Sequence, residues 1–135
     1  MARIAHIAVK VEDINESAEF YEKVLGFVPT GKSRSPDRSR RSFSDGEINL
    51  TILRYDSEDA AMAQAARQGP CIHHFAIEVD DVGKSVEQVR AFGCEILSDS
   101  TKAPVKFRAP GGTIAEIVPV GRYRMGMESG AGGIR

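Results

Sequence analysis

The sequence contains two copies of one segment, and this internal repeat limits the possible folds more than any other feature. Residues 3–13 (RIAHIAVKVED) and 71–81 (CIHHFAIEVDD) align without a gap at an offset of 68 residues (71 − 3). The identical pairs at this offset are Ile4/Ile72, His6/His74, Ala8/Ala76, Val11/Val79, Asp13/Asp81, Ser17/Ser85 and Glu19/Glu87. A repeat this long exceeds the unit of a solenoid and predicts a duplicated half-domain.

Both copies predict the same order of secondary structure. Each opens with a strand rich in β-branched and aromatic residues, and alternation places His6 and His74 on the face opposite the apolar side chains. Asp13 and Asp81 are predicted N-caps of the helices that follow. Further strands are expected at about 27–28, 41–44 and 47–54 in the first half, and at 94–98, 105–108 and 113–118 in the second. The predicted fold is therefore α+β, with two βαβββ modules that form a cleft.

The length of 135 residues corresponds to one domain. We expect a single domain over residues 1–121, made of repeats at about 1–55 and 70–121. Residues 56–69 are predicted to link the repeats through a short helix, and the Gly-rich residues 122–135 to form a flexible C-terminal tail.

Composition and charge exclude several classes of function. The net charge of −1 gives no electrostatic basis for binding nucleic acid or an anionic membrane. No apolar run approaches the roughly 20 residues that cross a bilayer, and no signal peptide is recognisable. Cys71 and Cys94 fit no metal or redox spacing. We therefore expect a cytoplasmic protein with reduced cysteines.

Two histidines and a glutamate are the candidate metal ligands. His6 and His74 occupy equivalent positions, so a pseudo-two-fold axis would bring their rings together. Glu116 lies in an apolar final strand, where an unpaired carboxylate is costly to bury. Its counterpart in the first half is Asn49, if one residue is gapped. Two imidazoles and a carboxylate suit a divalent ion of iron, manganese, nickel, cobalt or zinc, and no other cofactor is expected.

Asn49 is the weakest member of this set, because a neutral amide oxygen is a poor ligand for these ions. We expect Asn49 to act catalytically by holding a metal-bound water or the substrate through a hydrogen bond. Three protein ligands would leave open positions at which substrate binds directly. His73 is predicted to point to the opposite face of its strand, away from the chemistry.

The segment 30–43 (TGKSRSPDRSRRSF) carries five basic residues and has two interpretations. It is either a solvated loop or a mobile flap that clamps an anionic substrate, since arginine matches carboxylate and phosphate groups. Lys106 and Arg108, in the strand beside Glu116, are further candidates for binding an anion.

Three stretches of the sequence resemble the vicinal oxygen chelate superfamily. They are HIAVKVEDINESAEFYEKVLGFVPT, HHFAIEVDD and FRAPGGTIAEIVP, and the resemblance covers about residues 3–120. The superfamily includes glyoxalase I, methylmalonyl-CoA epimerase, extradiol dioxygenases and bleomycin-binding proteins. The resemblance implies two βαβββ modules around a metal, a homodimer, and His6, His74 and Glu116 as ligands. A fourth ligand would fall at Asn49, and the asparagine departs from the usual glyoxalase and epimerase pattern.

The resemblance implies a metal-dependent lyase or isomerase, similar to glyoxalase I or an epimerase, that acts on a small oxygen-chelating and in some cases anionic substrate. Glu116 would also shuttle a proton, with Glu47 as a reserve base. One alternative is an iron-dependent, ring-cleaving extradiol dioxygenase. Another is a metal-free binding protein of the bleomycin-resistance kind, although such a binder has no need of the His/His/Glu set.

Overall fold

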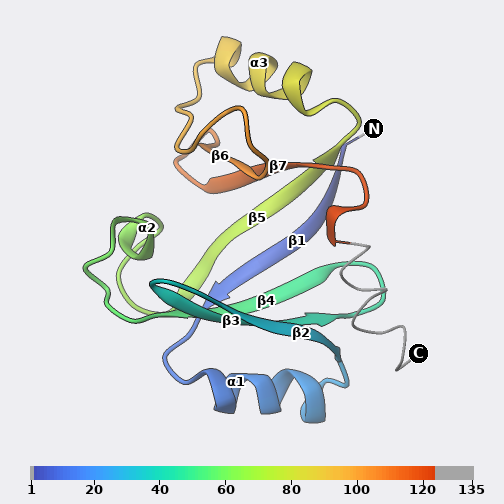
Figure 1. The fold of residues 1–135 in the computed structure, drawn as a ribbon, viewed down its shortest axis with the longest axis vertical. Coiled ribbons are helices and arrows are strands. Elements are labelled where there is room, and N and C mark those ends of the chain that lie inside the picture. Colours follow the sequence, from blue (N-terminus) through green and yellow to red (C-terminus); the bar gives the residue numbers. More distant parts are fainter. Residues whose placement is uncertain (1, 124–135) are drawn as a thin grey trace.

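A computed structural model describes residues 2–123, which fold into one seven-stranded sheet with three α-helices (Figure 1). The strands are β1 (Arg3–Lys10), β2 (Val28–Ser35), β3 (Arg38–Ser44), β4 (Asn49–Tyr55), β5 (Cys71–Val79), β6 (Val105–Arg108) and β7 (Ile114–Pro119). The helices are α1 (Ile14–Glu19), which continues as a π-helical turn η1 (Phe20–Val24), α2 (Ala61–Gln64) and α3 (Val82–Phe92).

The sheet repeats one arrangement on either side of its centre. Its strand order is β2-β3-β4-β1-β5-β7-β6. The first strand of each half lies parallel to the last strand of that half, β1 to β4 and β5 to β7. The two first strands, β1 and β5, pair antiparallel at the centre. The predicted α+β class is confirmed, and the equivalent positions of the sequence repeat lie on these two central strands.

The basic segment 30–43 is not a loop. It forms most of a β-hairpin, in which β2 and β3 pair from Val28 opposite Ser44 to Ser35 opposite Arg38. Pro36 and Asp37 make the two-residue connection, where proline favours a turn. The strands expected at about 27–28 and 41–44 coincide with the open end of this hairpin, but the strand pairing of residues 29–40 was not expected. Alternating serine and arginine give no apolar periodicity.

The strand predicted at 94–98 is reduced to a single bridge between Ile96 and Phe107. Backbone hydrogen bonds join Leu97 N–H to the Lys106 carbonyl and Arg108 N–H to the Glu95 carbonyl. The hydroxyl of Ser98 then accepts from the Lys106 N–H and takes the place of a further strand–strand bond. The second half therefore has two full strands after its helix.

The helices α1 and α3 lie at opposite ends of the molecule, with the sheet between them (Figure 1). Each begins where the sequence predicts, because Asp13 and Asp81 accept hydrogen bonds from backbone N–H groups of the first turn. Ala18 of α1 packs with buried Phe43 and Ile52, and the buried Val86 of α3 belongs to a second apolar cluster. Within residues 2–123, no helix is long and apolar enough to cross a membrane.

The segment between the two halves contains α2, and a buried lysine holds it to β1. The Lys10 side chain is only 2% exposed. Its ammonium donates to Glu58 Oε1 at 2.8 Å and to the carbonyl oxygens of Ala63 at 2.5 Å and Arg67 at 2.8 Å. These bonds satisfy all three donors of a buried charge. They fix α2 beside the central strands, next to the candidate site.

Candidate metal centre

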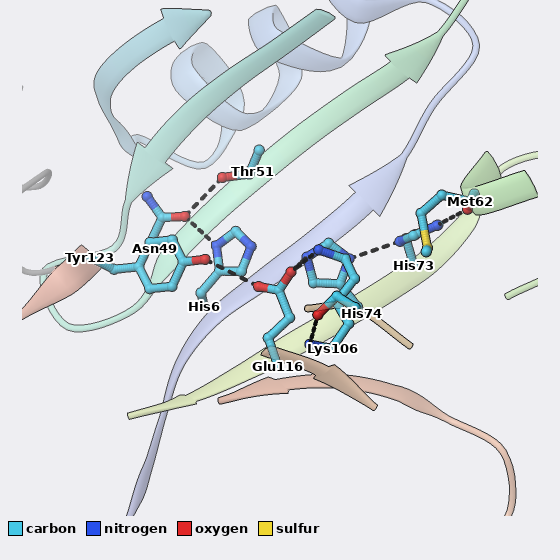
Figure 2. Close-up of polar contacts among 10 residues, drawn as sticks. His6, Asn49, Thr51, Met62, His73, His74, Lys106, Glu116 and Tyr123 are labelled. Carbon is cyan, nitrogen blue, oxygen red and sulfur yellow. Dashed lines mark hydrogen bonds and ion pairs between the residues drawn. The ribbon is translucent and has the colours of Figure 1, made fainter. Parts of the chain in front are cut away.

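His6, His74 and Glu116 converge from three strands of one chain (Figure 2). One ligand atom from each lies within 4.8 Å of the other two. All three side chains are buried, and the two imidazole centroids are 5.4 Å apart. We call these three residues the metal-centre residues. The structure brings together the set that the sequence analysis selected, with no contribution from a second chain.

Strand pairing explains the convergence. His6 lies opposite Ala76, and Ala76 lies opposite Glu116 on β7, so these three residues form one row across the sheet. His74 lies opposite Ala8 in the neighbouring row. Each histidine thus faces an alanine of the other repeat, and the small side chain leaves room for the imidazole.

Asn49 orients the ring of His6. The Asn49 Oδ1 atom lies 2.5 Å from His6 Nδ1 and also accepts from the hydroxyl of Thr51 at 2.8 Å. An amide oxygen only accepts, so His6 Nδ1 carries the proton and Nε2 carries the lone pair. Asn49 is not among the described residues that line the adjacent cavity. Its place favours a role in positioning His6 over direct contact with an ion.

His73 orients the ring of His74, although we expected the His73 side chain to point to the opposite face of its strand. Between the pairs Ala8–His74 and Val9–Ile72 the register of β1 and β5 shifts, so His73 is the extra residue of a β-bulge. Its Nε2 donates to the Met62 carbonyl oxygen at 2.6 Å, and its Nδ1 lies 2.8 Å from His74 Nδ1. His73 Nδ1 is therefore the acceptor, and His74 carries its proton on Nδ1.

Burial keeps the histidines neutral. Loss of solvation lowers the pKa of His6 and of His73, and it lowers the pKa of His74 to about 3. Neutral imidazoles are the form that binds a metal ion. Both His6 and His74 thus present an unprotonated Nε2, and that of His74 lies 3.4 Å from Glu116 Oε2.

Glu116 is ionised and surrounded by donors. Burial acts most strongly on the Glu116 carboxyl group and raises its pKa. Electrostatic interactions with the His74 ring and the Lys106 ammonium, together with the Lys106 hydrogen bond, outweigh burial, so the pKa lies below its usual value. The Lys106 ammonium bonds to Oε2, and the Tyr123 hydroxyl donates to Oε1 at 3.2 Å. Lys106 is thus the cation that balances the buried carboxylate.

Tyr123 was missed by the sequence analysis. Its ring stacks on His6, with centroids 4.2 Å apart and planes inclined by 4° (Figure 2). Arg122 and Tyr123 both border the cavity, although they belong to the predicted flexible tail; residues 124–135 of that tail lie outside the described residues. The aromatic and basic residues of the GRYR stretch, directly after the last strand, were the only signal for this contact.

A cavity of about 370 Å³ opens beside the metal-centre residues. Its lining comprises His6, Ala8, Ser35, Arg38, Arg40, Ser42, Thr51, Leu53, Tyr55, His74, Pro104, Lys106, Glu116, Arg122 and Tyr123. Glu47, the reserve base, is instead exposed in the turn before β4. Arg108 bonds to the carbonyl oxygens of Ala65 and Gly112, and it too is outside this lining.

The donor set fits a divalent first-row ion. Two neutral nitrogen donors and one carboxylate are a common protein ligand set for such ions. The unprotonated His74 Nε2 and the Glu116 carboxylate are both acceptors and lie 3.4 Å apart. In the chain without metal, the Lys106 ammonium is the cation next to this pair, and a divalent ion would take the same place. The Nδ1 atom of His6 is hydrogen-bonded to Asn49 and that of His74 to His73, and metal-binding histidines usually have such a partner on their second nitrogen.

Comparison with known proteins gives a consistent result. The family model described as "Glyoxalase/Bleomycin resistance protein/Dioxygenase superfamily" matches residues 3–112. Human mitochondrial methylmalonyl-CoA epimerase is 28% identical over 130 residues, covering 87% of this chain and 73% of the relative. Lactoylglutathione lyase of Haemophilus influenzae is 30% identical over 113 residues, covering 77% of this chain and 76% of the relative.

A solved structure of a mutant 4-hydroxymandelate synthase from Streptomyces coelicolor superposes with a TM-score of 0.73 at 27% identity. The match covers 86% of this chain and 36% of that one. The sheet and its two outer helices therefore recur in a larger protein.

Proposed function

Because the chain belongs to the glyoxalase/bleomycin resistance protein/dioxygenase superfamily, we propose that it is a divalent-metal-dependent lyase or isomerase acting on a small, oxygen-chelating substrate. The observation that carries the proposal is the clustering of ligand atoms from His6, His74 and Glu116 within 4.8 Å. The relatives named methylmalonyl-CoA epimerase and lactoylglutathione lyase support this type of reaction over others.

His6, His74 and Glu116 would hold the ion, and iron, manganese, nickel, cobalt and zinc all suit this donor set. A bound divalent ion would supply Lewis acidity, which stabilises negative charge on the oxygen atoms of the substrate. Asn49 and His73 would keep the two imidazoles in the required tautomer, with Nε2 unprotonated.

Glu116 is the group to which we assign proton transfer. Among the described residues that line the cavity it is the one carboxylate, whereas Glu47 is exposed outside it. Its ionised form can accept a proton from a substrate carbon and return that proton to a different position. Tyr123 and Lys106 hold the two carboxylate oxygens and so limit the rotation of the group.

An iron-dependent dioxygenase is the second candidate, and the position of Asn49 favours it. Asn49 Oδ1 already contacts His6 Nδ1 and the Thr51 hydroxyl. The centre would therefore have three protein donors, two histidines and a carboxylate. That donor set with open positions is typical of non-haem iron oxygenases. A metal-free binding protein of the bleomycin-resistance kind is the third.

Metal analysis of protein purified without chelator separates these candidates. We expect close to one ion per chain. Nickel, cobalt, zinc or manganese supports a lyase or isomerase, and iron supports the dioxygenase. A protein that retains no metal even after reloading would be a binding protein, contrary to the proposal. His74→Ala should lose the ion and keep its circular dichroism spectrum, while Arg41→Gln, on the outer side of the hairpin, should retain both.

The resemblance to small superfamily members also supports a homodimer, and we propose this assembly. Large apolar side chains are exposed on both central strands, with Ile4 51% and Ile72 72% exposed. Light scattering coupled to size-exclusion chromatography tests the proposal, and a mass of one chain would contradict it. A cytoplasmic location stays a prediction from the sequence.

A further inference from the structure

We propose that the substrate carries an oxyanion, a carboxylate or a phosphate, and that Arg38 and Arg40 of β3 bind this group in the same cavity as the metal-centre residues. The inference rests on the proposed function. There, the chelating oxygen atoms of the substrate would face the ion, and here the oxyanion is assigned to the other end of the same substrate.

The charges that line the cavity do not balance. Among its described lining residues, Arg38, Arg40, Lys106 and Arg122 are cationic and Glu116 is the one carboxylate. Lys106 already pairs with Glu116. Arg38 pairs with Asp37, which lies outside the lining. Arg40 and Arg122 therefore give the cavity an excess of positive charge, and a divalent ion would increase it. Such a cavity attracts anionic ligands.

Arg40 lacks a counter-ion of its own. Within residues 2–123 no carboxylate forms an ion pair with it, and its Nε donates to the Ser33 hydroxyl at 3.2 Å. Burial, followed by the repulsion of Arg38, lowers the pKa of Arg40. The carboxylate of Asp37 opposes this effect from a distance, without a direct ion pair to Arg40. Arg40 lines this cavity and also a second one on the side of Ser33. Within residues 2–123 its two terminal nitrogens make no hydrogen bond, so both are available to a ligand.

Arg38 is held beside Arg40 in a fixed position. The two residues are separated by one position on β3 and so share a face of the strand. The Arg38 guanidinium lies 5.5 Å from the centroid of the Tyr55 ring, and its Nη1 donates to Asp37 Oδ1 at 2.8 Å. Burial raises the pKa of Tyr55, so this residue is a neutral hydroxyl donor at the same end of the cavity.

The strand register separates the two ends of the cavity. Ser44 of β3 lies opposite Asn49 of β4, which lies opposite His6 of β1. Arg40 lies opposite Leu53, four residues further along β4. Four residues correspond to about 13 Å of strand. From the row of His74, in which Ala8 lies opposite Thr51, the step to Leu53 is two residues, or about 7 Å. A ligand that reaches both ends therefore needs an anionic group several bonds away from its chelating oxygens.

A guanidinium pair selects an oxyanion over other polar groups. Each guanidinium presents parallel N–H donors that match two oxygens of a carboxylate or phosphate, which a lysine ammonium does not. Hydrogen bonds between charged partners are also stronger than neutral ones. Two adjacent arginines with a neutral tyrosine are thus suited to a compact oxyanion.

The test measures anion binding to chelator-treated, ¹⁵N-labelled protein by NMR titration at constant ionic strength. The probes are inorganic phosphate and malonate. Arg40→Gln should weaken binding of the preferred probe at least tenfold. Arg41→Gln is the matched control: it removes the same charge from the next residue, whose Nη1 donates to Asn15 Oδ1 in α1. This control should bind like the wild type.

Stronger binding of phosphate supports a phosphorylated substrate, and stronger binding of malonate supports a carboxylate. Equal weakening in the two variants, or no saturation by either probe, would overturn the inference. A metal titration of the same samples separates this result from the proposed function. Wild-type protein that binds the anion but never retains a metal would support the anion site and contradict the proposed metal-dependent function.

Discussion

The Nδ1 atoms of His73 and His74 lie 2.8 Å apart, and hydrogen bonding determines that the proton between them belongs to His74. His73 cannot supply it, because its own proton is on Nε2 and is donated to the Met62 carbonyl oxygen. A residue next to the candidate ligand therefore sets the tautomer of that ligand, and it is held in turn by α2 in the segment between the halves.

Two substitutions of His73 test this role separately from packing. In His73→Asn the amide oxygen stands near the former Nδ1 and can still accept from His74. In His73→Gln the amide nitrogen stands near the former Nε2, so the bond to Met62 is kept and the acceptor is lost. We expect His73→Gln to weaken zinc or cobalt binding about 10- to 100-fold, and His73→Asn to bind nearly as tightly as the wild type.

Long-range ¹⁵N–¹H correlations of the imidazole rings in metal-free protein provide the independent measurement. His74 should be protonated on Nδ1 in the wild type and in His73→Asn, and should populate both tautomers in His73→Gln. Equal loss of metal affinity in both variants, with an unchanged His74 tautomer, would show that His73 only fills space.

Replacing Lys106 by methionine should change two properties in opposite directions. The ammonium neutralises the buried Glu116 carboxylate, so metal-free Lys106→Met should lose about 3 kcal/mol of unfolding free energy through the unpaired charge. The same change removes a cation that competes with the metal, so affinity for zinc should rise at least tenfold. Urea unfolding and metal competition measure the two effects, with exposed Lys102→Met as the control. A fall in both quantities would contradict this account of the ion pair.

The metal-free protein should lose stability below about pH 6.5. The pKa of His74 is about 3 in the folded chain, against the ordinary value of 6.5, and burial also lowers those of His6 and His73. Below pH 6.5 the unfolded chain therefore binds protons that the folded chain does not. Each such histidine reduces the free energy of unfolding by up to roughly 1.4 kcal/mol per pH unit, until the pH reaches its folded pKa.

Urea denaturation at pH 7.5, 6.5 and 5.5 in the presence of chelator measures this slope. His74→Asn removes one titrating group and should reduce the slope over this range. A free energy of unfolding that stays constant from pH 7.5 to 5.5 would show that the histidines are solvated and protonated in the folded state.

Tyr123→Phe should leave metal binding close to wild type and change the environment of Glu116. The ring keeps its stacking on His6, while the hydrogen bond to Glu116 Oε1 is lost. Loss of a bond to a charged acceptor corresponds to about 1.5–3 kcal/mol. We expect the free energy of unfolding of the metal-free protein to fall by this amount, and Tyr21→Phe is the control. An unchanged free energy of unfolding in Tyr123→Phe would show that the Tyr123 hydroxyl does not form a stabilising hydrogen bond with Glu116.

The repeat made the central strands and the metal-centre residues predictable. His6 and His74 follow from their equivalent positions, and Glu116 from a charge that interrupts an apolar strand. These are local patterns with a regular period. Most of the β2–β3 hairpin beyond the expected strand at 41–44 was not predictable, because its polar residues show no such period and its strands are defined by their mutual pairing.

The role of His73 depends on a bulge between β1 and β5, which single-strand alternation cannot reveal. Tyr123 follows the last strand, and only the folded chain brings it onto His6. His73 and Tyr123 were thus harder to find than the candidate ligands, because their positions depend on contacts between distant segments.

The cross-pairing of His6 with Ala76 and of His74 with Ala8 has an evolutionary consequence. After duplication, two copies of a segment are ordinarily free to diverge, but here each copy supplies the space that the imidazole of the other requires. A larger side chain arising at either alanine would displace the histidine in the opposite half. The two copies can therefore diverge freely along their outer surfaces while their central strands change only together.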